Sequence, residues 1–344
     1  MSAKIAKLLW YPLFNSIVFN EDKYLRAPAE SNFTITTQDF RLALLFWPDS
    51  TASSPTTHRQ MVTKWDGNLD ADSGWWLGYK PSDGSAYFIL NDGGTGVTLS
   101  VAGAITNDAW NLVVVEADRG GNVVLYVNGV AKDSDDMSGV TGSIDKATEP
   151  FLLCRNNNFK GRIGYFSMDA YVYGAAWCLE EYYRIKYGWP RKDNINTDVG
   201  NMPQGVWNFN ESLADESGSY DFIYMNSSFP TYYGAGYPSS CSLLFNYRVG
   251  SEMGFLPLDG TVRTQGGALR LHPGSNKLFS TLVISTNEIE KMIALQGAWL
   301  SRSYVDLWED ISKPQTLRGR IITAPRVRPL NGGFYEFTLE IEEQ

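Results

Sequence analysis

The chain has 344 residues, of which 43% are hydrophobic, 14% aromatic and 19% charged, and its formal net charge is −9. This composition is too apolar and aromatic for a disordered chain. The acidic balance argues against nucleic-acid binding, which needs clustered lysine and arginine. The few grouped basic residues lie in or beside a predicted strand and indicate a solvated or interface surface: Arg318, Arg320, Arg326 and Arg328.

The cysteines and the first residues indicate where the protein folds. Cys154, Cys178 and Cys241 lack the spacing of a disulfide framework or a zinc site. No apolar run near Met1 fits a signal peptide, and no run is long enough to span a membrane. We therefore expect folding in a reducing cytoplasm, without membrane insertion.

Residues 8–173 read as a series of short strands joined by tight turns. Residues 40–46 are apolar on both faces, as in a strand buried in a sandwich. Residues 110–116 and 122–127 are predicted to pair with each other. The dipeptide Asn128-Gly129 then closes the next hairpin, because a type I′ turn needs positive φ at both central residues.

The order of these pieces resembles a laminin-G-like (concanavalin A-like) jelly-roll domain over residues 8–190. The resemblance implies a two-sheet antiparallel sandwich, a fold that usually binds a ligand. It rests on the strand 40–46 and on four further motifs: Lys64-Trp65-Asp66-Gly67 followed by Trp75-Trp76-Leu77-Gly78-Tyr79, Trp110 with its valines, Leu125-Tyr126-Val127-Asn128-Gly129, and Phe159-Lys160-Gly161-Arg162-Ile163.

The pattern changes after Tyr173. Residues 175–187 predict a short helix, and residues 191–204 a polar linker. Residues 206–218 predict a strand that either returns to the first sandwich or begins a truncated second copy of it. We therefore expect a jelly roll over 1–190, a connecting segment over 191–245 and a second domain over 246–344.

The second domain has the order of a small α+β unit, a β-sandwich plus one helix, in a chain that is mainly β. Its helix follows a capping box at Ser285–Glu288 and carries an apolar stripe. The unit resembles the tail-tube, tail-terminator, distal-tail and minor-tail proteins of tailed phages. The resemblance implies anchoring in a ring, with an oligomer interface on the helix at Ile289, Met292, Ile293 and Trp299.

Aromatic and amide side chains are the candidate ligand contacts. Alternation sends Trp75 and Trp76 to opposite faces, so one belongs to the core and the other is free to act as a sugar platform. Tyr79 accompanies them, and Tyr171 shares a face with Tyr173. The asparagines Asn156, Asn157 and Asn158 could hydrogen-bond a polar ligand or form a plain turn.

One acidic loop has the spacing of a calcium site. Asp66, Asn68, Asp70 and Asp72 alternate oxygen-bearing side chains, although the closing glutamate of an EF-hand would fall at Leu77. A hydrated hairpin loop is the alternative. No other cofactor is indicated.

Catalytic signals are weak. His58 and His272 are the two histidines, and no nucleophile elbow, phosphate loop or zinc-protease motif is present. The alternating carboxylates Glu336, Glu340 and Glu342 lie in the second domain and fit a solvated face. We expect a protein that is not an enzyme.

The resemblances together predict a structural protein of a phage virion, in the tail or baseplate, assembled in the host cytoplasm. Its partners would be other virion proteins, further copies of itself and host-surface glycans. The alternatives are a capsid decoration protein with a purely structural jelly roll, and a soluble glycan-processing enzyme.

Overall fold

The fold was analysed in a computed structural model of the chain. The structure describes residues 4–10, 16–21, 24–27, 35–52, 57–65, 73–146, 149–155, 159–186, 205–207, 209, 223–225, 231–233, 241–247, 255–256, 269–271, 278–286, 289–300, 305–308, 317–321, 326–329 and 335–343.

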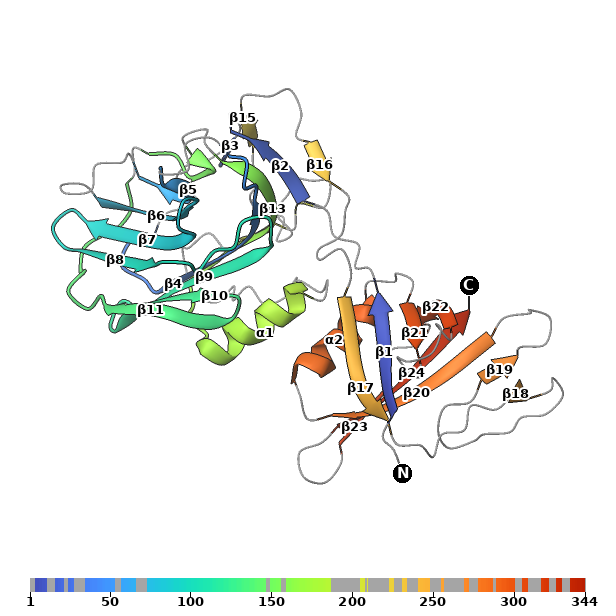
Figure 1. The fold of residues 1–344 in the computed structure, drawn as a ribbon. Helices are drawn as coiled ribbons and strands as arrows, with labels where there is room; N and C mark the ends of the chain where they lie inside the picture. Colours follow the sequence, from blue (N-terminus) through green and yellow to red (C-terminus); the bar gives the residue numbers. More distant parts are fainter. Residues whose placement is uncertain are drawn as a thin grey trace. The chain divides into compact units, whose positions relative to one another are not determined.

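The chain divides into two compact units, each discontinuous in sequence (Figure 1). The sandwich unit consists of Phe14–Tyr182 and Pro190–Gly234. The terminal unit consists of Met1–Leu13, Tyr183–Trp189 and Ala235–Gln344. Neither helix in the described residues is long and apolar enough to cross a membrane.

The first sheet of the sandwich unit, named here the β4 sheet, is antiparallel throughout. Its order is β11-β10-β9-β4-β13-β2-β16, and β14 also pairs with β13. The strands are β2 (Ser16–Asn20), β4 (Phe40–Pro48), β9 (Asn111–Ala117), β10 (Asn122–Val127), β11 (Val130–Asp136), β13 (Lys160–Asp169), β14 (Gly205–Trp207) and β16 (Thr231–Tyr233).

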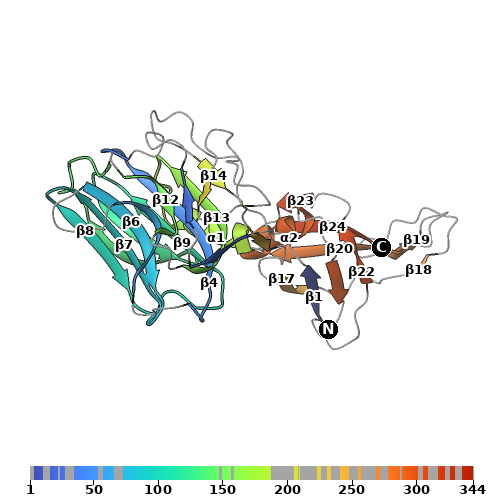
Figure 2. The ribbon, with the colours of Figure 1, turned by 90° about the horizontal axis from the view of Figure 1, so that it is seen from above.

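The second sheet, named the β6 sheet, is also antiparallel and has the order β15-β3-β12-β5-β6-β7-β8 (Figures 1 and 2). The prediction of a mainly β chain with a two-sheet antiparallel sandwich is therefore confirmed. The strands are β3 (Tyr24–Arg26), β5 (Arg59–Lys64), β6 (Ser73–Lys80), β7 (Ser85–Asp92), β8 (Gly96–Val101), β12 (Leu152–Leu153) and β15 (Ile223–Met225).

The core fills the space between the two sheets. Alternation along β4 turns Leu42, Leu44 and Phe46 inward, all at most 2% exposed. The ring of Phe46 lies 5.3 Å from that of Tyr79 on β6. Burying one such side chain contributes roughly 1.5–3 kcal/mol, so this interior holds the sandwich together.

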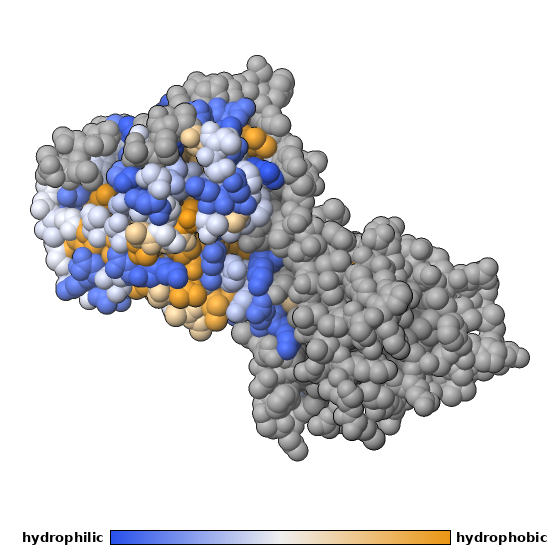
Figure 3. All heavy atoms as spheres, viewed as in Figure 1, coloured by the Kyte–Doolittle hydropathy of each residue, from blue (hydrophilic) through white to orange (hydrophobic). Residues whose placement is uncertain are grey.

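The helix α1 (Ala175–Lys186) packs against the turn between β10 and β11. Asn128 has φ 51° and Gly129 φ 79°, which confirms the predicted turn with positive φ at both central residues. A Cβ at Gly129 would lie 2.9 Å from the Leu179 Cα, so only glycine permits this approach. Ala175 and Ala176, at the start of the helix, are exposed. Figure 3 shows hydrophobic residues among hydrophilic ones on this face of the sandwich unit.

The terminal unit contains a nine-stranded sheet ordered β17-β1-β21-β22-β24-β20-β19-β18, with β23 beside β24. Its helix is α2 (Ile289–Leu300). The sandwich-plus-helix form expected for this part of the chain stays a prediction. The strands are β1 (Lys4–Trp10), β17 (Cys241–Tyr247), β18 (Phe255–Leu256), β19 (Leu269–Leu271), β20 (Leu278–Thr286), β21 (Val305–Trp308), β22 (Leu317–Ile321), β23 (Arg326–Pro329) and β24 (Tyr335–Glu343).

The first strand lies in a different unit from the one expected. The sequence suggested a jelly roll over residues 1–190, whereas β1 pairs with both β17 and β21 of the terminal unit. For residues 206–218 the structure agrees with the first of the two alternatives, a strand that returns to the sandwich unit, since β14 pairs with β13. Both units are therefore discontinuous in sequence, whereas the sequence analysis predicted domains that are each one continuous segment.

Candidate functional site

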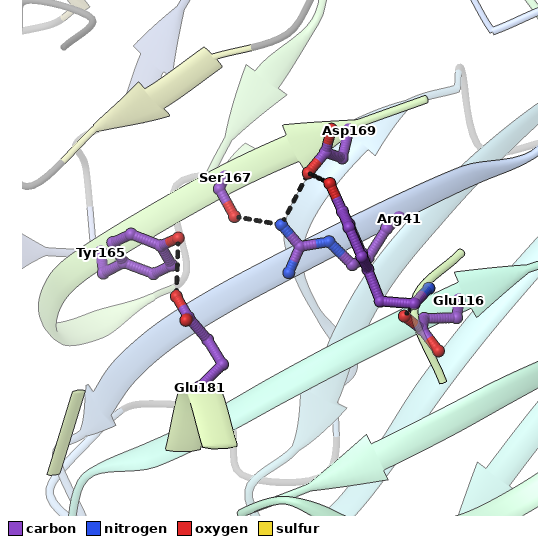
Figure 4. Close-up of polar contacts among 7 residues, drawn as sticks. Arg41, Glu116, Tyr165, Ser167, Asp169 and Glu181 are labelled. Atoms are coloured by element: carbon purple, nitrogen blue, oxygen red, sulfur yellow. Dashed lines mark hydrogen bonds and ion pairs between the residues drawn. The ribbon is translucent and has the colours of Figure 1, made fainter. Parts of the chain in front are cut away.

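A buried polar cluster lies on the outer face of the β4 sheet, beside α1 (Figure 4). Alternation along β13 sends Tyr165, Ser167 and Asp169 to this face. The strand register places Arg41 of β4 opposite both Asp169 and Glu116. With Glu181 of α1, these side chains are each no more than 3% exposed.

Arg41 is the centre of the cluster. Its Nη2 donates hydrogen bonds to Asp169 Oδ2 at 3.0 Å and to Ser167 Oγ at 3.3 Å. Its guanidinium carbon lies 3.8 Å from the centre of the Trp177 ring. Burial alone would lower the pKa of Arg41, but the charge of Asp169 and other neighbours raises it overall, so the guanidinium stays charged.

The other two carboxylates fix the segment that leads into α1 and the helix itself. Glu116 accepts hydrogen bonds from the backbone N–H groups of Tyr173 at 2.8 Å and Gly174 at 2.9 Å. The Tyr165 hydroxyl donates to Glu181 Oε1 at 3.1 Å. Burial, assisted by Glu181, raises the pKa of Tyr165, so this phenol remains a donor. Both acids are buried, and their hydrogen bonds hold the chain between β13 and α1 and the helix itself in place.

Three aromatic rings, named here the ring ladder, stand at the edge of this cluster: Tyr171, Tyr173 and Trp177. Tyr173 stacks on Trp177 with centroids 4.8 Å apart, and Tyr171 meets Tyr173 edge-on at 4.9 Å. The Tyr173 hydroxyl donates to Asp169 Oδ2 at 3.2 Å. Tyr171 is 47% exposed, and in the described residues no other aromatic side chain is among the exposed large apolar ones. The exposed Tyr171 ring therefore packs on Tyr173, which is itself held by Trp177 and Asp169.

The predicted aromatic contacts separate into core and surface. Trp75 and Tyr79 are fully buried, because alternation turns them inward with Leu77, and this corrects their assignment as ligand contacts. Trp76 faces the other way and is 5% exposed, with the Tyr87 ring stacked 6.3 Å away. Tyr171 alone of the four is open to solvent.

The remaining predicted sites are only partly described. The asparagines 156–158 and the acidic loop Asp66, Asn68, Asp70 and Asp72 lie outside the described residues. Within the described ranges, no three His, Cys, Asp or Glu side chains could hold a metal ion.

The predicted interface helix is α2, which begins at Ile289. Ile293 is 5% exposed, while Met292 and Trp299 are half-buried. The oligomer interface on this helix stays a prediction.

Sequence reasoning missed Arg41 and Trp177. The available signal for Arg41 was a single charge within the apolar run 40–46, which a two-sided buried strand accommodates only when the charge is paired. Trp177 sits near the start of a weakly amphipathic helix, where nothing in its spacing marks a ring that stacks on an arginine.

Three solved structures of low sequence identity are similar in fold to this chain. A candidate carbohydrate-binding protein from Bacteroides ovatus has 12% identity and a TM-score of 0.47, with 65% of this chain and 60% of that chain covered. The sialidase CBM40 module of Ruminococcus gnavus bound to α2,3 sialyllactose has 18% identity and a TM-score of 0.33, with 42% and 82% covered. The heptameric SAP-like pentraxin of Limulus polyphemus has 12% identity and a TM-score of 0.39, with 66% and 94% covered. At this similarity they say nothing about what this chain binds.

The family comparison is more specific, whereas the search of curated proteins finds no match. Residues 19–169 match the model of the concanavalin A-like lectin/glucanases superfamily, Laminin_G_3. The matched range begins in β2 and ends with β13, so it contains the central strands of both sheets. Residues 19–169 therefore form a concanavalin A-like jelly-roll domain.

Proposed function

We propose that the sandwich unit is a carbohydrate-binding module and that its ligand contacts the ring ladder. The observation that carries this proposal is the 47% exposure of Tyr171 on top of two stacked rings. The family match of residues 19–169 to lectins and glucanases supports the ligand class. The burial of Glu116, Asp169 and Glu181 favours binding over hydrolysis, because a glycosidase needs two carboxylates beside the scissile bond.

The ring ladder suits a sugar in two ways: it presents an aromatic face, and its side chains are already ordered. A sugar ring has a C–H face that packs on an aromatic ring and a rim of hydroxyls that needs polar partners. The ladder is already fixed, since Tyr173 hydrogen-bonds Asp169 and Trp177 lies against Arg41. On a preorganised surface, little binding free energy is lost to the ordering of side chains.

The test is a glycan array with the full chain, followed by calorimetry on the glycans that bind. Tyr171→Ala should weaken binding at least about tenfold, equivalent to about 1.4 kcal/mol. Val130→Ala is the matched control, since Val130 is an equally exposed apolar side chain at 52%. Tyr87→Ala probes the outer face of the β6 sheet. Unchanged affinity for Tyr171→Ala, or loss only with Tyr87→Ala, would contradict the proposed site.

We further propose that the chain is a virion structural protein of a tailed phage, in the tail or baseplate, assembled in the host cytoplasm. The resemblance of residues 246–344 to tail proteins supports this role. The terminal unit would join a ring of identical subunits and other virion proteins, while the sandwich unit binds host-surface glycans. A capsid decoration protein with a structural jelly roll and a soluble glycan-processing enzyme are the alternatives.

Light scattering on the full chain tests the assembly. A ring-sized oligomer supports the tail role, because rings are built from repeated heterologous interfaces. A monomer at all concentrations contradicts a self-assembling ring and favours the decoration role. Release of reducing sugars from a bound polysaccharide would instead support the enzyme.

A further inference from the structure

We infer that the ring-ladder site selects uncharged sugars and excludes acidic ones such as sialic and uronic acids. This inference rests on the proposed glycan binding at the same site and adds its specificity. It follows from the ion pairs and hydrogen bonds that the charged side chains around the ladder already make.

Arg41, the cation that lies against the ladder, is not available to a ligand carboxylate. Arg41 is paired with Asp169 at 3.0 Å, and both side chains are 3% exposed. Its Nε and Nη1 make no hydrogen bond within the described part of the chain, yet both atoms are buried. The rings of Trp177, at 3.8 Å, and Tyr173, at 5.2 Å, lie against the guanidinium. To bind an anion, Arg41 would have to leave Asp169 as an unpaired buried charge, which is strongly unfavourable.

The surrounding groups add negative rather than positive charge. Against the single guanidinium of Arg41 the cluster holds three buried carboxylates, Glu116, Asp169 and Glu181. In a poorly hydrated environment a like charge brought near such a cluster is repelled more strongly than in bulk water.

The rim of the site carries a further acid. Asp169, the last residue of β13, pairs with Arg41 near the start of β4, so Asp39 and Tyr171 lie beyond the same end of this strand pair. Asp39 is exposed, and its Oδ1 accepts a hydrogen bond from the Arg119 N–H at 2.7 Å. The Nη2 of Arg119 donates to the Gly142 carbonyl, so that cation is also engaged. Asp39 therefore adds a negative charge at this end of the strand pair, where the backbone N–H and the Nη2 of Arg119 are already hydrogen-bonded.

The experiment compares matched glycans on the full chain. Each neutral oligosaccharide is paired with the same chain carrying a terminal sialic or uronic acid. We expect the acidic member of every bound pair to bind at least about tenfold more weakly in low salt, with a smaller ratio at high salt because the repulsion is screened. An acidic glycan that binds as tightly as its neutral partner, and is lost with Tyr171→Ala, would overturn the inference while leaving the glycan-binding function intact. Absence of binding by either member of every pair would overturn both.

A charge variant tests the cause. Asp39→Asn keeps an acceptor for the Arg119 N–H and removes one rim charge, so it should strengthen acidic-glycan binding about two- to threefold and leave neutral glycans unchanged. Asp83→Asn is the control, because Asp83 is an exposed carboxylate in the β6–β7 turn of the other sheet. Equal effects of the two variants, or none for Asp39→Asn, would show that local charge does not set the specificity.

Discussion

Replacement of Gly129 by alanine tests whether α1 is held against the β10–β11 turn. Gly129 has φ 79°, and a Cβ there would lie 2.9 Å from Leu179 Cα, 3.0 Å from Leu179 Cδ1 and 3.2 Å from Tyr182 Cβ. The left-handed backbone alone should cost about 1–2 kcal/mol for alanine. The contact with Leu179 Cα is with backbone, so no rotamer change relieves it, and overpacking should add about 1–3 kcal/mol.

The matched control is Gly103→Ala. Gly103 has φ 67° but nothing within 4 Å of an added Cβ, so it measures the backbone penalty without the packing penalty. Urea unfolding of the sandwich unit, followed by tryptophan fluorescence, gives the free energy of unfolding of both variants. Proteolysis within residues 170–186 should also accelerate only in Gly129→Ala. Equal destabilisation of the two variants would refute the reasoning that glycine is needed for the approach of α1.

Three further predictions concern stability. Arg41→Ala should lower the free energy of unfolding by about 3–5 kcal/mol, since Asp169 would stay buried without a partner, and a loss below about 1 kcal/mol in urea titration would contradict this. Burial raises the pKa of Cys154 and of Cys178 above the usual thiol value, so their contribution to stability is complete below about pH 8.5 and is lost as pH rises through the folded-state pKa. The melting temperature should accordingly fall between pH 8 and 10, and a flat profile would argue against it. Deletion of residues 1–10 should unfold the terminal unit and spare the sandwich unit in calorimetry, because β1 pairs on both sides within its sheet; two unchanged transitions would disprove that dependence.

Features set by neighbouring residues could be predicted from the sequence. The Asn128-Gly129 turn and the strands around it follow from local patterns, and the structure has both. Alternation also predicted that Trp75 and Trp76 face opposite ways. It could not say which one enters the core between the sheets, because that depends on which face of β6 the other sheet covers; both are buried, and Trp75 is the one in the core.

The candidate site depends on contacts between distant residues. Arg41 and Asp169 are 128 positions apart, and nothing near either residue specifies the other. Tyr171 could be named because alternation puts it on the same face as Tyr173, whereas its contact with the Tyr173 ring and its exposure follow from the folded structure. The same holds for β1, whose partner strands follow the whole sandwich unit in sequence.

The placement of β1 has a consequence for synthesis on the ribosome. Lys4 pairs with Tyr247 and Trp10 with Cys241, so the first strand emerges long before its partners exist. The sandwich unit can fold as soon as its own strands have emerged, since domains fold as units during translation. The terminal unit must wait, and such non-local pairing folds slowly. The order of maturation is thereby fixed: the sandwich unit is complete first, and β1 pairs only after β17 and β21 have been made.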